Sequence, residues 1–325
     1  MKLLVSADIH VKLKTKNIPD DWARNRFRLL FQKLSELEKS VDMHIVAGDF
    51  FDKVPSLEEL ELYYEFVATR TTTTKIVPGN HEALRKDSTF LSYLKNITNR
   101  INSLVRVEDE YFTQYEVGEP AIDFIPYNKL KEFEKGKSEY EFKAPTLVTH
   151  VRGEIPPHVK PEVDLEIFNK WKVVLAGDLH SYDNCQRNIL YPGSPITTSF
   201  HRTPTDTGVI IYDTSTFDHE FVKLDLPQLI RKTIKAGDPM EPHGVNHIIY
   251  EVEGDMAELA AVADNELLDK KVVKRAVDTA LILSPEMSIE EEITDYLTFI
   301  LELPEETIEK ALKVFHDNIK NTEMV

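Results

Sequence analysis

The chain has 325 residues, with 39 Lys and Arg against 56 Asp and Glu, and therefore carries a formal charge of −17. A hydrophobic content of 42% is enough to bury a full core and excludes a disordered or fibrous chain. The single cysteine, Cys185, excludes an intrachain disulfide and a thiolate zinc site, and it fits a reducing cytosol. No apolar run approaches the roughly 20 residues of a membrane helix, and Asp8 comes too early for a signal peptide. We therefore expect a soluble cytoplasmic protein without a membrane partner.

The negative charge argues only weakly against an anionic partner, because it is unevenly distributed. Residues 286–325 contain eleven acidic and three basic side chains, and so hold −8 of the −17. Six basic residues lie close together near the N-terminus: Lys12, Lys14, Lys16, Arg24, Arg26 and Arg28. Two interpretations stay open for this stretch, an ordinary solvated face or a track for a phosphate backbone.

Short apolar runs rich in β-branched residues predict five strands, at Leu3–Ala7, Met43–Ala47, Lys75–Val77, Thr146–Thr149 and Val173–Ala176. Between the early strands, apolar periodicity predicts a helix over Trp22–Leu37, and a capping box of Ser56 with Glu59 predicts the start of another. Continuous apolar strands suit a sheet that helices cover on both faces, and strand–helix alternation is typical of an α/β fold.

A domain boundary is predicted near Asp225–Pro227, after two further strands at Gly208–Tyr212 and Glu220–Leu224. Beyond it, the pattern predicts a strand at Asn246–Val252, a helix at Met256–Lys270 and a strand at Lys274–Leu283. Together these elements would form a small α/β module. We therefore predict three parts, namely residues 1–225, 226–285 and 286–325.

The sequence of residues 286–325 predicts two short amphipathic helices. Ser288 and Glu291 form a capping box, and Pro304 suits the first turn of a second helix. Apolar residues line one face of each predicted helix: Ile289, Ile293, Tyr296, Leu297 and Ile300, then Ile308, Leu312, Phe315 and Ile319. The hairpin either packs on its own domain or forms a docking element for the helices of another protein.

Polar clusters end the predicted strands, where open α/β sheets build their sites. In chain order they are Asp8-Ile9-His10, Gly48-Asp49-Phe50-Phe51-Asp52, Gly79-Asn80-His81-Glu82, His150 and Gly177-Asp178-Leu179-His180. Each fragment alone is a weak signal, but five in order, rich in Asp, His and Asn and without Cys, suit Mn²⁺, Fe²⁺ or Mg²⁺. The ligands outnumber those that one ion can use. Two ions roughly 3.5–4 Å apart that share a carboxylate would catalyse phosphoester hydrolysis.

This ordered set resembles the calcineurin-like metallophosphoesterase superfamily. Tyr191-Pro192-Gly193-Ser194-Pro195 before Ser199-Phe200, and Ile125-Pro126-Tyr127 before the His150 strand, are similar to SbcD-type DNA repair nucleases. The chain resembles a compact, phage-encoded recombination endonuclease subunit. The resemblance rests on specific motifs over residues 1–225, and beyond residue 225 only on the order of the predicted elements. The resemblance implies a four-layer sheet sandwich with helices outside, a small α/β capping module that binds DNA, and a C-terminal helical hairpin.

The resemblance also implies roles for individual residues. Asp8, His10 and His180 would bind the first metal, Asn80 and His150 the second, and Asp49 would bridge the two. His81 would stand beside the scissile phosphate, and Asp52 would orient His81 or a ligand. Asp178 departs from the family, which has a histidine there. We expect Asp178 to stay a ligand and to tilt the preference toward Mn²⁺, with Mg²⁺ as the alternative.

The implied function is a metal-dependent DNA exonuclease and endonuclease in recombination, repair or replication. The resemblance further implies an SbcC-type ATPase partner at the C-terminal helices, a homodimer on DNA, and a place in the host cytoplasm. Two alternatives stay open. One is a phosphomonoesterase or cyclic-nucleotide phosphodiesterase with the same metals; the other is a scaffold that has lost catalysis, for which Asp178 is the argument.

Three residues outside these motifs also need an interpretation. His44 lies within an apolar strand, and we interpret it as a core histidine with its hydrogen bonds satisfied. His201 and Arg202 follow the Ser-Phe motif, and they are either surface residues or phosphate contacts.

Overall fold

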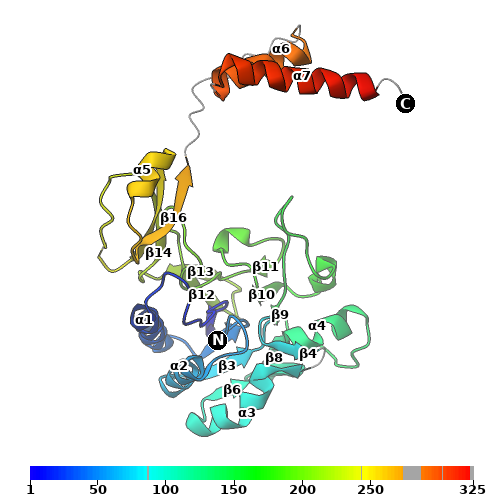
Figure 1. Ribbon diagram of the computed structural model, residues 1–325. Helices are drawn as coiled ribbons and strands as arrows, with labels where there is room; N and C mark the ends of the chain where they lie inside the picture. The colour runs from blue at the N-terminus through cyan, green and yellow to red at the C-terminus, as the bar shows by residue number, and fades with distance from the viewer. Residues whose placement is uncertain (86–87, 243, 274–286, 302, 323–325) are drawn as a thin grey trace. The chain divides into compact units, whose positions relative to one another are not determined.

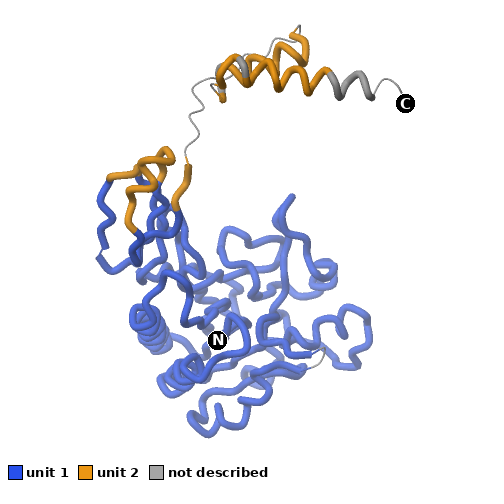
Figure 2. Tube along the Cα trace, viewed as in Figure 1, with its two compact units in different colours: residues 1–234, 238–252, 264–270 blue, residues 235–237, 253–263, 271–325 orange. Residues whose placement is uncertain are grey.

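The computed structural model describes residues 1–85, 88–242, 244–273, 287–301 and 303–322. The chain divides into two compact units (Figure 2), residues 1–234, 238–252 and 264–270 in the larger and residues 235–237, 253–263 and 271–325 in the smaller. The predicted boundaries at 225 and 285 stay a prediction, and the second of them lies outside the described residues.

Two sheets form the centre of the larger unit (Figure 1). The first has the order β13 (His219–Lys223), β12 (Gly208–Asp213), β1 (Lys2–Ser6), β2 (Met43–Ala47), β3 (Thr73–Val77), β6 (Val105–Val107). The second has the order β11 (Ile189–Leu190), β10 (Val173–Gly177), β9 (Thr146–His150), β8 (Glu119–Ile125), β7 (Phe112–Glu116). Because β1, β2 and β3 pair in parallel, as do β8, β9 and β10, the carboxyl ends of each set share one edge of their sheet.

The two sheets pack face to face through apolar side chains. Leu3 and Val5 of β1 belong to a buried cluster with Val148 of β9 and Leu175 of β10. Leu4, between them, belongs to a different cluster on the opposite face of the first sheet. Each of these side chains is fully buried and contributes about 1.5–3 kcal/mol to the free energy of unfolding.

Helices cover the outer faces of both sheets. Three cover the first sheet: α1 (Asp20–Glu38), α2 (Leu57–Ala68) and α3 (Phe90–Ile101). The second sheet packs against α4 (Tyr127–Glu134) and the short 3-10 helix Leu165–Phe168, through Leu130 and Phe168. The predicted four-layer α/β sandwich is therefore confirmed. The predicted capping box of Ser56 and Glu59 is also present, at the start of α2.

A third, smaller sheet has the order β14 (Leu229–Lys235), β15 (His247–Gly254), β16 (Leu268–Val273). The predicted helix Met256–Lys270 is wrong beyond Ala261, because α5 covers only Met256–Ala261 and β16 follows. Val262 is already extended, and the side chain of Asn265 accepts a hydrogen bond from the Leu267 amide, which turns the chain. The predicted strand Lys274–Leu283 lies outside the described residues.

The smaller unit contains the predicted helical hairpin. Helix α6 (Ile289–Asp295) starts at the Ser288–Glu291 capping box and continues as a π-helical turn over Tyr296–Ile300, before α7 (Glu305–Thr322). His316 Nε2 of α7 lies 2.9 Å from a carboxylate oxygen of Glu290 in α6. None of the described helices has the length and apolar character that a membrane span needs.

The His44 interpretation is confirmed. Its imidazole is fully buried and lies 2.8 Å from Glu38 Oε1 and 2.9 Å from Ser6 Oγ. Glu38 also accepts a 2.6 Å hydrogen bond from the guanidinium of Arg70. Burial would raise the pKa of Glu38, but His44 and Arg70 lower this pKa to about 2. The buried negative charge of Glu38 is therefore paired with the positive charge of Arg70.

Candidate metal centre

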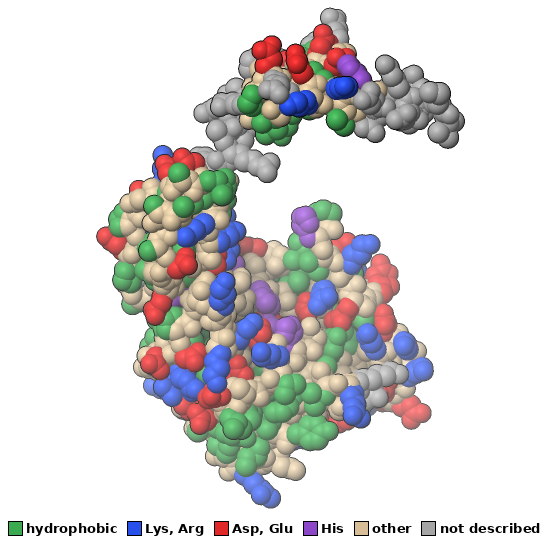
Figure 3. Space-filling model, in the orientation of Figure 1, with side chains coloured by type: hydrophobic (Ala, Val, Ile, Leu, Met, Phe, Trp, Pro, Cys, Tyr) green, Lys and Arg blue, Asp and Glu red, His purple; other side chains and the backbone are tan. Residues whose placement is uncertain are grey.

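The predicted site residues follow the carboxyl ends of strands in both sheets. Asp8 and His10 follow β1, Asp49 follows β2, and Asn80 and His81 follow β3. His150 is the last residue of β9, and Asp178 and His180 follow β10. Because the sheets pack face to face, these loops converge at one edge of the sandwich. Histidine side chains (purple) gather in a hollow of the molecular face that Figure 3 shows.

Backbone hydrogen bonds join the first two of these loops. The amide of Asp8 donates to Gly48 O at 3.1 Å, and the amide of His10 donates to Asp49 O at 3.0 Å. Asp8, His10 and Asp49 have φ values of 51°, 48° and 52°, and Asp178 has φ 108°. Left-handed conformations of non-glycine residues cost on the order of 1–3 kcal/mol each and are typical of functional sites.

Two glycines allow the loops to approach so closely. A Cβ atom on Gly79 would collide with the backbone and carboxylate of Asp49, and one on Gly48 would collide with the imidazole of His150. Gly48 also has φ +94°, which favours glycine. The glycines in Gly48-Asp49 and in Gly79-Asn80-His81 are therefore part of the site's construction.

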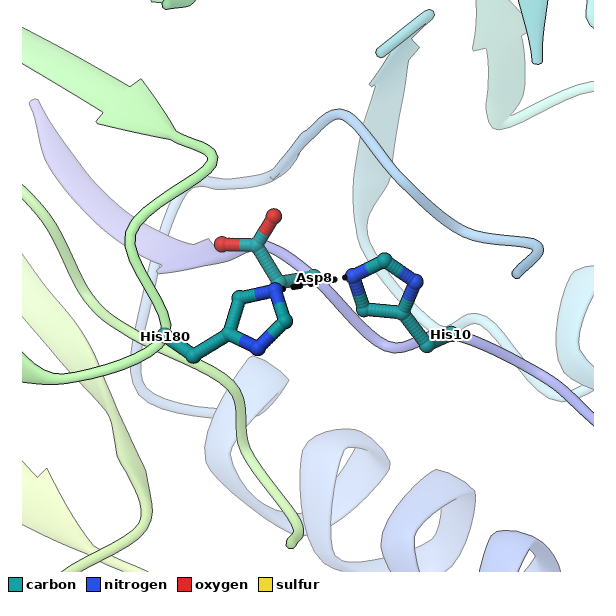
Figure 4. A group of neighbouring side chains, drawn as sticks. All are labelled: Asp8, His10 and His180. Atoms are coloured by element: carbon teal, nitrogen blue, oxygen red, sulfur yellow. Dashed lines mark hydrogen bonds between the residues drawn. The ribbon is translucent and has the colours of Figure 1, made fainter. Parts of the chain in front are cut away.

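One group of potential ligands consists of Asp8, His10 and His180. Their ligand atoms all lie within 4.8 Å of one another. The side chains come from the loops after β1 and β10 and meet in one place, with His10 Nε2 and His180 Nε2 3.0 Å apart (Figure 4). His180 Nδ1 lies 3.2 Å from the hydroxyl of Thr198. The second ring nitrogen of His180 therefore has a partner that orients the ring.

A second group consists of Asp8, Asp49 and His150, again within 4.8 Å. Asp49 Oδ2 lies 3.5 Å from His150 Nε2 of the same group and 3.6 Å from His10 Nε2 of the first group. Asp49 is therefore close to ligands of both groups. His150 Nδ1 donates to Ala47 O at 2.9 Å, and this bond directs Nε2 into the site.

The electrostatics of these buried groups favour a cation. Burial raises the pKa of Asp8 well above its usual range. Burial also lowers the pKa of His10 to about 4, which keeps this imidazole neutral, as a ligand must be. For Asp49, burial would raise the pKa, but the charge of His150 and its hydrogen bond to Asp49 outweigh burial and hold this pKa well below the usual range. Burial would lower the pKa of His150, but the nearby carboxylates raise it well above its usual value. A divalent ion among these buried carboxylates and imidazoles would balance the negative charge in place of the proton on His150.

Asn80 lies against two members of the second group, His150 and Asp49. Its amide lies beside His150 Nε2, with the oxygen 2.9 Å away. With the amide rotated, its nitrogen donates to Asp49 Oδ2 at 3.0 Å and to His150 Nε2 at 2.9 Å, and the amide oxygen is then free to act as a ligand. Nδ1 of His10 is, in addition, a buried nitrogen without a hydrogen-bond partner in the described part of the chain.

Residues 1–182 match the sequence model of the calcineurin-like phosphoesterases. The chain belongs to this family. It is 40% identical over 323 residues to a protein of Escherichia phage T5 named "Probable exonuclease subunit 1", across 96% of this chain and 97% of that protein. The predicted resemblance to calcineurin-like metallophosphoesterases and to a phage nuclease subunit is thus confirmed.

Two solved structures are also similar. One is described as an archaeal phosphodiesterase, with a TM-score of 0.37 and 14% identity over 69% of this chain and 100% of that chain. The other is a protein of Thermus thermophilus, with a TM-score of 0.41 and 12% identity over 68% of this chain and 98% of that chain.

Asp178, at the position where the sequence resemblance implies a histidine, lies at the edge of the second group. Its Oδ1 atom is 3.8 Å from His150 Nε2, and its Oδ2 atom accepts a 3.2 Å hydrogen bond from Arg152 Nε. The Asp178 amide donates to Asp8 Oδ1 at 3.0 Å. Sequence reasoning did not find Arg152; its signal was its position two residues after His150. The guanidinium compensates the negative charge that aspartate brings in place of histidine.

His81 and Asp52 are adjacent, but the Asp52 carboxylate does not hold His81. His81 Nδ1 donates to the backbone oxygen of Asp52 at 2.6 Å, and its Nε2 lies 3.9 Å from Asp49 Oδ2. The Asp52 carboxylate pairs with Lys12 at 2.9 Å and lies 3.8 Å from His10 Nδ1. The structure thus brings all nine predicted site residues to one region, while their roles stay a prediction.

Glu82 is a further residue that sequence reasoning missed, although it ends the Gly79–Glu82 cluster. Its buried carboxylate accepts hydrogen bonds from the amides of Phe51 and Gly79, both at 2.8 Å. Burial, with a smaller contribution from Asp49, raises the pKa of Glu82 to about 7. Glu82 therefore ties the loop after β3 to the loop after β2, and so places Asn80 against Asp49.

The basic residues near the N-terminus are largely neutralised by acidic residues. Three of the cations pair with carboxylates of α2, namely Lys14 with Glu58 at 2.7 Å, Arg24 with Glu61 at 3.7 Å and Arg28 with Glu65 at 2.7 Å. Arg26 is buried and donates to Thr197 O at 3.0 Å. These contacts favour the solvated-face interpretation over a track for DNA. Arg202 pairs with Glu251 at 2.8 Å, which favours its interpretation as a surface residue.

Replacement of Glu82 by glutamine tests the tie between the loops. An amide would offer one acceptor oxygen to two backbone donors and would face one of them with its own NH₂ group. We expect the affinity for Mn²⁺, measured by isothermal titration calorimetry on metal-free protein, to fall about 10- to 100-fold.

The matched control is Asp123→Asn, because Asp123 is also buried and its carboxylate accepts from the Ala144 amide and from Trp171 Nε1, outside the candidate ligand loops. Equal Mn²⁺ affinities of the two variants would contradict the role assigned to Glu82.

Proposed function

We propose that this protein is a DNA exonuclease and endonuclease that uses two divalent cations, with Mn²⁺ preferred over Mg²⁺. The observation that carries the proposal is the pair of ligand groups that meet at Asp49. Asp8, His10 and His180 would hold one ion, and Asn80, His150 and Asp178 the other. The name of the phage T5 relative supports DNA as the substrate class.

The donor set supports the metal preference. It contains only carboxylate, amide and imidazole groups, and Asp178 replaces a neutral ring by an anionic oxygen. Oxygen-rich sites favour hard ions such as Mn²⁺ and Mg²⁺, and several imidazoles favour Mn²⁺ over Mg²⁺. When bound, the two ions would supply an activated water and charge neutralisation for in-line displacement at phosphorus.

The chain's own residues would position the substrate around these ions. His81 is held through Nδ1 and presents Nε2 toward the site, where it would stabilise the transition state or protonate the leaving oxygen. Asp52 would fix His81 through its backbone oxygen. Arg152 would keep Asp178 oriented toward His150.

Replacement of His81 by alanine tests this function. We expect cleavage of end-labelled single- and double-stranded DNA to require Mn²⁺, and His81→Ala to lower kcat about 10²- to 10³-fold while Mn²⁺ affinity stays within about threefold. His158→Ala removes an exposed histidine outside the site and should cleave like the wild type.

Two results would contradict the proposal. A higher kcat/KM for small phosphate esters than for oligonucleotides would favour the phosphomonoesterase or cyclic-nucleotide alternative. A wild-type protein that binds Mn²⁺ and DNA without cleavage would favour the scaffold alternative.

We further propose that the C-terminal hairpin binds an SbcC-type ATPase. The relative's name describes a subunit, which supports a partner protein. The hairpin also exposes large apolar side chains, with Ile289 66% and Tyr296 45% exposed. Exposed apolar residues on a helical face are typical of a groove or coiled-coil partner.

Deletion of residues 288–325 tests this partnership. The truncated protein should lose association with a co-expressed SbcC-type ATPase in size-exclusion chromatography, because the apolar face is removed. It should keep Mn²⁺-dependent cleavage of oligonucleotides, because every candidate ligand lies before residue 181. Association that survives the deletion would contradict the proposal.

A homodimer is the third part of the proposed function. Helix α3 exposes Tyr93 and Ile97, and Leu57 at the start of α2 is also exposed. Apolar side chains gather on the face in Figure 3 where Figure 1 places α3. A second copy packed against α2 and α3 would bury this surface and set two metal centres around one DNA.

A further inference from the structure

We propose that the pocket between β4 (Ala83–Arg85) and α4 is a subsite for an unpaired DNA strand next to the scissile phosphate. The inference rests on the proposed nuclease function and adds where the substrate strand lies. The pocket has a volume of about 530 Å³. Cavities of this size hold small ligands, which suits one or two unpaired nucleotides rather than a duplex.

The walls of the pocket adjoin residues of the candidate metal centre. β4 begins directly after Asn80-His81-Glu82, and the amide of Ala83 donates to Asn80 O at 3.2 Å. On the other wall, the ring of Tyr127 packs edge-on against the ring of His150, with centroids 6.0 Å apart. A strand whose phosphate lies at the metal ligands would therefore extend into this pocket.

The charge of the lining suits a polyanion. Four cationic side chains line the pocket against two carboxylates: Arg85, Lys131, Lys135 and Lys137 against Glu132 and Glu162. Glu162 is already engaged, since it accepts from Tyr127 Oη at 3.2 Å and from the Arg152 amide at 3.1 Å. Within the described ranges, no ion pair joins any of the four cations to a carboxylate. The paired lysines and arginines near the N-terminus differ from them in this respect. A local positive charge in a chain of −17 is a specific attraction for phosphates.

Arg152 extends this positive charge to the metal centre. Its side chain is 44% exposed and donates to Asp178, while its backbone is bonded to the pocket residue Glu162. The cations thus continue from the candidate ligands into the pocket, as a track that follows a nucleic-acid backbone requires.

The remaining lining is apolar and aromatic. Tyr127 and Leu130 contribute apolar surface, and Leu84 is 41% exposed. Proteins bind single strands by combining cations for the phosphates with aromatic rings on which bases stack. A second pocket, of about 730 Å³ beside His180, is lined by Ser and Thr hydroxyls with Asp183 and Asp206. Its described lining contains no Lys or Arg, so it lacks the charge that would attract a phosphate.

The test is binding of a fluorescent single-stranded oligonucleotide to the full chain by anisotropy, in Ca²⁺ and at several salt concentrations. The double variant Lys131→Glu/Lys135→Glu should bind at least tenfold more weakly. Its slope of log K against log salt should be shallower by about 1.4, at roughly 0.7 for each phosphate that the variant no longer neutralises. Tyr127→Ala should weaken binding roughly tenfold, whereas Tyr127→Phe, which keeps the ring, should not.

The control double variant is Lys14→Glu/Arg28→Glu, which makes the same change of charge at cations already paired with glutamates. Its slope should match that of the wild type. Equal slopes for the pocket variant and the wild type, with wild-type cleavage of DNA intact, would overturn the inference alone. A wild-type protein that neither binds nor cleaves DNA would overturn the proposed function as well.

Discussion

The burial of carboxylates and imidazoles against one another at Asp49 is the constraint on which the rest of the structure depends. Asp8, Asp49 and His150 are almost completely buried, and no apolar core tolerates such a set without compensation. Three features maintain this arrangement. Asp8, His10 and Asp49 have left-handed backbone conformations, and two glycines leave no room for a Cβ atom. The buried carboxylate of Glu82 accepts hydrogen bonds that join two of the loops. The sandwich supplies the edge at which such loops can meet, and a bound divalent cation would supply the charge that balances them.

Much of the fold and of the site follows from the sequence, because the signals are local. The strands from β1 to β10 that carry the site are continuous apolar runs, and the carboxyl ends of parallel strands share an edge, so polar clusters after them must converge. The prediction of a helix over Met256–Lys270 was wrong because the apolar pattern is ambiguous after Ala261. There the turn at Asn265 ends the helical direction of the chain. Glu82 and Arg152 were missed because their roles depend on partners more than 20 residues away in the chain.

Local charge pairing also could not be predicted from the sequence. The sequence of the basic stretch that ends at Arg28 allows a phosphate track, but α2 places a glutamate opposite three of its six cations. The cations without an ion pair among the described residues include those that line the pocket, and they lie at the end of β4 and on or just after α4. An acidic protein can therefore attract a polyanion to one place, because net charge governs solubility and the local field governs docking.

The most direct test of the central claim is anomalous diffraction from crystals of the full chain grown with Mn²⁺. The account predicts two peaks on either side of Asp49, one contacting Asp8, His10 and His180 and the other contacting Asn80 and His150. A single peak, or peaks that do not contact Asp49, would contradict it.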